Sequence, residues 1–148
     1  MELQQDFREL LELFNKHEVS YVIVGAYALA MHGVPRYTGD LDILVKSDKE
    51  NSQRILVALV EFGFGSMGLS ESDFIVADNV IQLGVPPVRV DIITSLTGVS
   101  WAEVYAHRIA GNYGDTPVYF IGREQFITNK RALGRKKDLA DLEELGEE

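Results

Sequence analysis

Residues 38–45 read TGDLDILV, an acidic pair that runs into an apolar segment. Because successive side chains of a strand point to opposite faces, Asp40 and Asp42 would share one face, roughly 6.6 Å apart along the strand, while Leu41 and Ile43 turn into the core. Two unit charges about 6 Å apart repel by roughly 3 kcal/mol at an effective dielectric near 20. The pattern therefore predicts a strand whose two carboxylates need a cation between them.

Magnesium fits this requirement. Carboxylate oxygens are the hard ligands that Mg²⁺ prefers, and substrate phosphates and water usually complete its octahedral shell. Asp40 and Asp42 are therefore interpreted as ligands of a nucleotide-bound Mg²⁺. The alternative is a half-buried strand whose solvent face happens to be acidic, which is the commoner origin of a bare Asp-x-Asp pattern. The neighbouring segments have to distinguish the two.

The preceding residues 24–33 read VGAYALAMHG, which is typical of a strand end, a glycine turn and a short helix. Gly25 permits a tight turn, and the free amides at the helix start, together with the positive end of the helix dipole, make an anion pocket suited to phosphate. Small residues here also have an ordinary explanation, because a helix packed closely on a sheet requires them. The value of the segment is its short distance from Asp40.

A third acid stands in residues 88–93, which read VRVDII. On a strand Val90 and Ile92 would face one way and Arg89 and Asp91 the other. If this strand neighbours the strand of Asp40, three acids converge, which is the layout that two Mg²⁺ ions need for an in-line displacement. The alternative is an exposed acid paired with the nearby arginine.

The rest of the chain alternates helical and strand patterns. Ser47 and Ser100 are each expected to open a helix through a capping box, and Gly134 to end another. The predicted fold class is α/β (α+β), a mixed twisted sheet of about five strands flanked by helices, with strands 80–83 and 88–93 paired as a hairpin. Strands are also predicted for residues 21–24, 40–46 and 118–121, and helices for residues 3–17, 26–31, 48–62, 72–77, 101–110, 123–133 and 137–145.

Composition narrows the function classes. With 148 residues, 46% of them hydrophobic, residues 1–148 are expected to form one domain. A net charge of −9 argues against broad binding to nucleic acid, and the lack of a membrane span or signal layout predicts a cytoplasmic protein. Basic residues gather between 123 and 137. The part of it at residues 130–137 is interpreted as a solvated helix end, a phosphate clamp or a docking patch for RNA.

These residues together resemble the minimal nucleotidyltransferases of the DNA polymerase β superfamily, especially the bacterial abortive-infection and toxin–antitoxin type. That superfamily has a strand, a glycine turn, a helix, an Asp-x-Asp strand and a later third acid. Here those places hold Gly25, the pair Asp40 and Asp42, and Asp91, and the ending 130–142 is also similar. Ala26 stands where the family usually has serine or glycine. The resemblance spans nearly the whole chain and implies a nucleotidyltransferase-like fold.

The resemblance also implies roles for individual residues. Asp40 and Asp42 would bind Mg²⁺, two ions in all, and Asp91 would complete the metal site and take the acceptor's proton. Charge stabilisation of the nucleotide phosphates is the main requirement of such chemistry. The residues expected to hold the triphosphate are Gly25, Ala26, Arg36, Thr38 and Lys130.

The expected function is a Mg²⁺-dependent transfer of a nucleoside monophosphate, AMP from ATP, onto a hydroxyl with release of pyrophosphate. The acceptor would be a protein, an RNA or a small molecule, and its site would come from this chain's surface, a second copy or a small helical partner protein. One alternative is a catalytically silent sensor or antitoxin that binds a nucleotide or a partner. Another is a metal-dependent phosphodiesterase that uses the same acids without consuming ATP.

Overall fold

A computed structural model describes residues 4–35, 39–85 and 88–147 of the chain. The described part contains six α-helices and six strands, with two short 3₁₀ turns at Gly65–Met67 and Glu71–Phe74. The helices are α1 Gln5–Lys16, α2 Gly25–Met31, α3 Lys49–Phe62, α4 Trp101–Ala106, α5 Arg123–Leu133 and α6 Lys136–Glu144. The strands are β1 Tyr21–Val24, β2 Asp40–Val45, β3 Val80–Val85, β4 Val88–Ile93, β5 Ile109–Tyr113 and β6 Thr116–Phe120.

The strands form one mixed sheet in the order β3-β4-β2-β1-β6-β5. β2 is antiparallel to β1 and parallel to β4, so it is a central strand with a partner on each side. Its inward residues Leu41 and Ile43 are fully buried, as the alternation predicted, while Asp40 and Asp42 are partly exposed. The mixed α+β fold class predicted from the sequence is confirmed.

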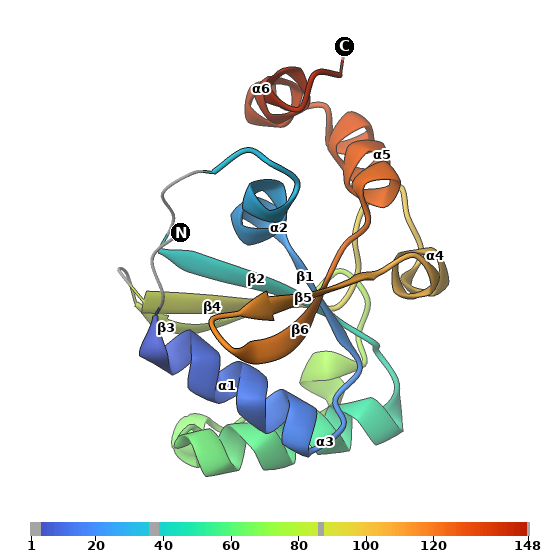
Figure 1. Cartoon of the computed structure of the whole chain (residues 1–148). Helices are drawn as coiled ribbons and strands as arrows, with labels where there is room; N and C mark the ends of the chain where they lie inside the picture. The colour runs from blue at the N-terminus through green and yellow to red at the C-terminus, as the bar shows by residue number, and fades with distance from the viewer. Residues whose placement is uncertain (1–3, 36–38, 86–87, 148) are drawn as a thin grey trace.

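Helices cover both faces of this sheet (Figure 1). α1 and α3 pack on one face, and α2, α5 and α6 lie on the other. The face under α1 and α3 is apolar: Phe7 and Phe14 of α1 and Ile55 of α3 are fully buried. None of the helices in the described ranges is long and apolar enough to cross a membrane.

Several predicted elements agree with the structure at both ends, namely the strands 21–24 and 88–93 and the helix 123–133. The predicted hairpin is also confirmed, because β3 and β4 pair antiparallel from Val80 opposite Ile93 to Val85 opposite Val88. Gly134 adopts the left-handed conformation at the end of α5, with φ 63°, as expected of a helix C-cap.

The sheet has six strands, one more than the sequence predicted, because the strand β5 was not recognised. The helix predicted to run to residue 110 ends at Ala106, and Ile109–Tyr113 forms the edge strand β5 paired with β6. An edge strand covered on few sides lacks the buried alternation that marks β2. The turn at Gly114, with φ 63°, between Tyr113 and Thr116 was the available signal for a hairpin.

One predicted cap is wrong by a residue. Ser47 does not open α3; the N-cap is Asp48, whose Oδ1 accepts a hydrogen bond from the backbone N of Asn51 at 2.8 Å. Both side chains can cap a helix, and the aspartate lies the required three residues before the amide that it satisfies. The second capping box is confirmed, with Ser100 and Glu103 bonded reciprocally.

Candidate active site

The turn from β1 into α2 brings the backbone against Asp42. Val24, the last residue of β1, pairs with Asp42 in the β1–β2 register. Gly25 then takes a left-handed φ of 68°, and a Cβ there would overlap the Asp42 carboxylate, lying 3.0 Å from its Cγ. Glycine is therefore required twice at this position, for its backbone conformation and for the close approach. Ala26 follows in the first turn of α2 and is partly exposed.

The third acid lies beside the first two. β2 and β4 are parallel neighbours, and their register places Asp42 opposite Asp91 and Asp40 opposite Arg89. Asp91 is 8% exposed. The adjacency that the interpretation of the sequence required is thus present, with the two aspartates on neighbouring strands directly across from each other.

A guanidinium group lies between two of the acids. Arg89 Nη2 is 2.9 Å from Asp40 Oδ2 and 3.2 Å from Asp91 Oδ2. Arg89 Nε is 3.1 Å from Asp91 Oδ1. From the sequence, pairing of Asp91 with Arg89 was the alternative to convergence of the three acids. The structure contains both. The contact with Asp40 was missed, because it depends on the register between two strands far apart in the chain.

Asp42 has an unusual protonation equilibrium. Its pKa is raised from 3.8 to about 6, first because burial penalises the charged form and then because the negative charges of Asp91 and Asp40 lie close by. The protonated carboxyl also donates a hydrogen bond to Asp91, whereas Arg89 opposes the shift. The site therefore has an excess of negative charge that one arginine does not compensate.

This excess fits a divalent cation. Asp42 and Asp91 are adjacent hard oxygen donors whose mutual repulsion an ion would relieve, and Asp40 lies two residue pairs along the register from them. Within residues 4–35, 39–85 and 88–147, however, no three acidic or histidine side chains are already arranged around one point as a ready-made metal cage. Binding of an ion would therefore require some of these carboxylates to change their contacts.

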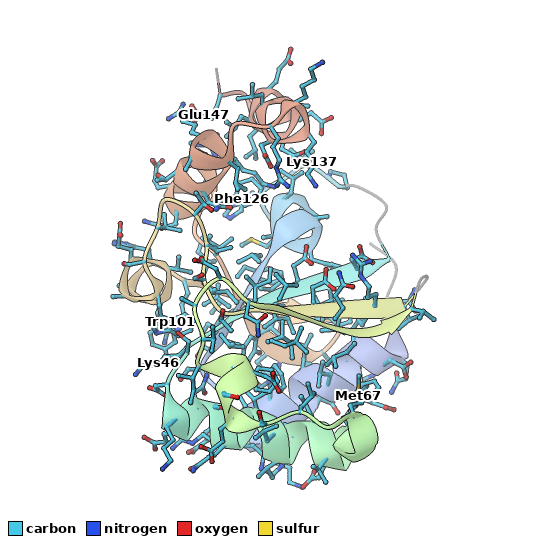
Figure 2. The ribbon with its side chains drawn as sticks, turned by 180° about the vertical axis from the view of Figure 1, so that it is seen from behind. Lys46, Met67, Trp101, Phe126, Lys137 and Glu147 are labelled. Atoms are coloured by element: carbon cyan, nitrogen blue, oxygen red, sulfur yellow. The ribbon has the colours of Figure 1, made fainter. Side chains whose placement is uncertain are left out.

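Lys130 belongs to a second charged cluster, between α5 and α6. Its Nζ lies 3.3 Å from Asp138 Oδ1 and 3.3 Å from Asp141 Oδ2, and its side chain is 14% exposed. Arg135 Nε also reaches Asp138 Oδ2 at 2.6 Å. Lys130 is thus a largely buried ion-pair partner on α5. Its partner helix α6 lies on the same side of the sheet as α2: Figure 2 shows Lys137 of α6 on that side and Met67 on the opposite side. A role of Lys130 at the phosphates stays a prediction.

Two predicted nucleotide-binding residues, Arg36 and Thr38, lie outside the described residues. The described chain resumes at Gly39, whose carbonyl accepts a hydrogen bond from the backbone N of Arg89 at 3.2 Å. The acids and Gly25 are therefore the part of the predicted site that the structure brings together, with Arg89 as the additional member.

Comparison with known proteins bears on the fold. No family model and no curated protein matches the sequence. Solved structures do match: a candidate nucleotidyltransferase from Thermotoga maritima superposes with a TM-score of 0.64 at 16% identity, covering 93% of this chain and 88% of the other. The lincosamide antibiotic adenylyltransferase LnuA, bound to lincomycin, superposes with a TM-score of 0.57 at 13% identity, covering 99% of this chain and 98% of LnuA. The antibiotic-resistance factor ANT(2″)-Ia superposes with a TM-score of 0.61 at 11% identity, covering 95% of this chain and 80% of the other. The chain has a nucleotidyltransferase-like fold.

Proposed function

We propose that this chain is a Mg²⁺-dependent nucleotidyltransferase that moves AMP from ATP onto a hydroxyl group and releases pyrophosphate. One observation carries the proposal: in a nucleotidyltransferase-like fold, Asp42 and Asp91 stand opposite each other on parallel neighbouring strands, directly beside the glycine turn at Gly25. An exposed acidic face without function would not need a glycine that admits the Asp42 carboxylate against the backbone.

The proposed reaction is an in-line displacement at the α-phosphorus. The acceptor oxygen forms the new bond to phosphorus, the bond to the bridging oxygen of the β-phosphate breaks, and pyrophosphate leaves with that electron pair. The proton of the acceptor hydroxyl passes to Asp91. The position of Asp91 supports this role, since it lies directly opposite Asp42 in the β2–β4 register and is only 8% exposed.

Asp40, Asp42 and Asp91 would hold the Mg²⁺ ions, two in the proposal. Bound there, they would supply charge stabilisation for the attacking and leaving oxygens. Gly25 and Ala26 would hold the triphosphate through backbone amides, and Arg36, Thr38 and Lys130 would neutralise it. For Lys130 this requires the ammonium group to contact a phosphate oxygen while it keeps its ion pairs with Asp138 and Asp141 of α6.

A small molecule is the favoured acceptor. The solved structure of LnuA, an adenylyltransferase of a lincosamide antibiotic, matches over nearly the full length of both chains. The net charge of −9 also disfavours an RNA acceptor, whose phosphates this surface would repel. A hydroxyl-bearing small molecule requires neither a basic surface nor a further domain.

The test is transfer of label from α-³²P-ATP with Mg²⁺, using lincomycin and water as acceptors and measuring pyrophosphate release. Asp42→Asn should abolish release, while Asp115→Asn should leave it unchanged, because Asp115 is 80% exposed in the β5–β6 turn. A Mg²⁺-ATP thermal shift without turnover would instead indicate the silent sensor. Cleavage of a phosphodiester without ATP would indicate the phosphodiesterase.

A further inference from the structure

Arg89 is placed where it must affect binding of a metal ion. Both oxygens of Asp91 face its guanidinium, Oδ1 at 3.1 Å from Nε and Oδ2 at 3.2 Å from Nη2. The same Nη2 lies 2.9 Å from Asp40 Oδ2. An ion on either oxygen of Asp91 therefore approaches an atom that Arg89 already contacts, and an ion on Asp40 Oδ2 approaches the same arginine nitrogen.

These contacts are incompletely satisfied. Arg89 Nε and Asp91 Oδ1 are both buried, yet among the described residues neither has a well-aligned hydrogen bond, although only 3.1 Å separates them. Their interaction is electrostatic without good hydrogen-bond geometry. A buried donor and a buried acceptor in this condition gain from a new partner, which a cation supplies to the carboxylate and an anion supplies to the guanidinium.

The two species that could bind here, a bare Mg²⁺ ion and a Mg²⁺–triphosphate complex, differ in charge. A bare Mg²⁺ on Asp91 displaces the guanidinium and leaves it beside another positive charge with no new partner. A Mg²⁺ bound to a triphosphate brings phosphate oxygens with it, and the planar fork of an arginine matches such oxygens in bidentate geometry. Only the second exchange leaves every charged group paired.

Resting on the proposed function, we propose that Arg89 is a positioning residue that makes the site select a metal–polyphosphate complex over a free divalent ion. When the metal–polyphosphate complex binds, the guanidinium of Arg89 leaves Asp40 and Asp91 and donates hydrogen bonds to the phosphate oxygens instead. Metal and nucleotide consequently bind with strong positive coupling, and each raises the affinity for the other by the same factor.

The test is a titration with Mn²⁺ followed by electron paramagnetic resonance of the free ion, with and without a non-hydrolysable ATP analogue. Wild type should bind Mn²⁺ weakly alone and at least tenfold more tightly with the analogue. Arg89→Gln should bind Mn²⁺ alone at least tenfold more tightly than wild type, with the coupling reduced by a similar factor. Arg89→Lys keeps the charge and should stay close to wild type without nucleotide.

The outcomes separate the inference from the function on which it rests. If wild type with the analogue binds Mn²⁺ no better than Asp42→Asn, the proposed function fails. If wild type shows the coupling but Arg89→Gln only lowers the melting temperature and leaves Mn²⁺ affinity unchanged, Arg89 is structural and the inference alone fails. Should Arg89→Gln not fold, the charge-balanced pair Arg89→Gln with Asp40→Asn replaces it, and it must bind Mn²⁺ more tightly than Asp40→Asn.

Discussion

Two clusters of buried charge in this molecule use the same kinds of side chain to opposite effect. Between β2 and β4, three aspartates lie near one arginine, which contacts Asp40 and Asp91, and the pKa of Asp42 is raised to about 6. Between α5 and α6, Asp138 and Asp141 share Lys130 and Arg135, and the hydrogen bond from Arg135 holds the pKa of Asp138 below its ordinary value. We refer to the first as the sheet cluster and to the second as the helix cluster.

The difference lies in the balance of charge. The helix cluster has a cation for each carboxylate, so folding alone satisfies it and the ionised form of Asp138 is favoured. The sheet cluster is short of positive charge, so folding leaves Asp42 partly protonated and the site prepared for a cation. On the proposed function, the balanced cluster stabilises the fold and the unbalanced cluster binds the metal ion. The four predictions below test this contrast.

The largest effect is expected from Asp42→Asn in the sheet cluster. Turnover should fall roughly 10²–10⁴-fold, the span that one charge-stabilising or proton-transferring group contributes. The rate of pyrophosphate release measures it, and circular dichroism should show an unchanged fold. Equal turnover in Asp42→Asn and the control Asp115→Asn would remove the catalytic assignment.

Lys130→Met should act on stability. Removing one partner of a buried ion pair typically costs about 3–5 kcal/mol, and Asp138, with a fully buried side chain, would retain only Arg135. Urea unfolding measures the loss. The matched variant Lys137→Met removes an exposed charge and should cost almost nothing. A normal stability would break the contrast, whereas a weakened affinity for ATP in addition to the lost stability would support the proposed phosphate role of Lys130.

Two glycines with nearly the same φ, one beside each cluster, provide a matched pair. Alanine at a left-handed φ costs on the order of 1–2 kcal/mol, which is the whole expected effect for Gly134→Ala, where the nearest atom would be 3.6 Å away. Gly25→Ala adds an overlap with the Asp42 carboxylate and should lose both more stability and the activity. Thermal unfolding of the two variants compares them; equal losses would show that Gly25 is needed only for its turn.

The fourth effect is a dependence of stability on pH. Because the folded pKa of Asp42, about 6, exceeds its ordinary 3.8, the folded state binds the proton more tightly. This contribution, roughly 3 kcal/mol, is fully present below pH 4 and is lost as pH rises through 6. Without metal, Asp42→Asn should therefore gain stability relative to wild type between pH 4 and 7, as measured by urea unfolding across pH. A constant difference would contradict the raised pKa.

The sequence predicted what depends on neighbours along the chain. Alternation assigned the faces of β2 and β4, and the glycine at position 25 assigned the tight turn between strand and helix, because both are local consequences of backbone geometry. The predictions for Arg36 and Thr38 remain open, since those residues lie outside the described part of the chain.

The features that were missed are non-local. The contact of Arg89 with Asp40 follows from the register between β2 and β4, and the partners of Lys130 follow from the packing of α6 on α5. No pattern within either segment encodes these pairings. The strand β5 was missed for a related reason, because an edge strand is defined by its partner β6 rather than by its own burial.

The in-register pairing of β2 with β4 limits where this chain can change length. Side chains alternate along a strand, so one residue inserted within β4 would point Val90 and Ile92 outward and drive Arg89 and Asp91 into the apolar layer. One residue inserted in the exposed stretch 75–78 before β3 would lengthen a surface connection at little cost, since loop entropy grows slowly with length. Related chains should therefore vary in length between residues 75 and 78 and keep the spacing within β2 and β4 constant.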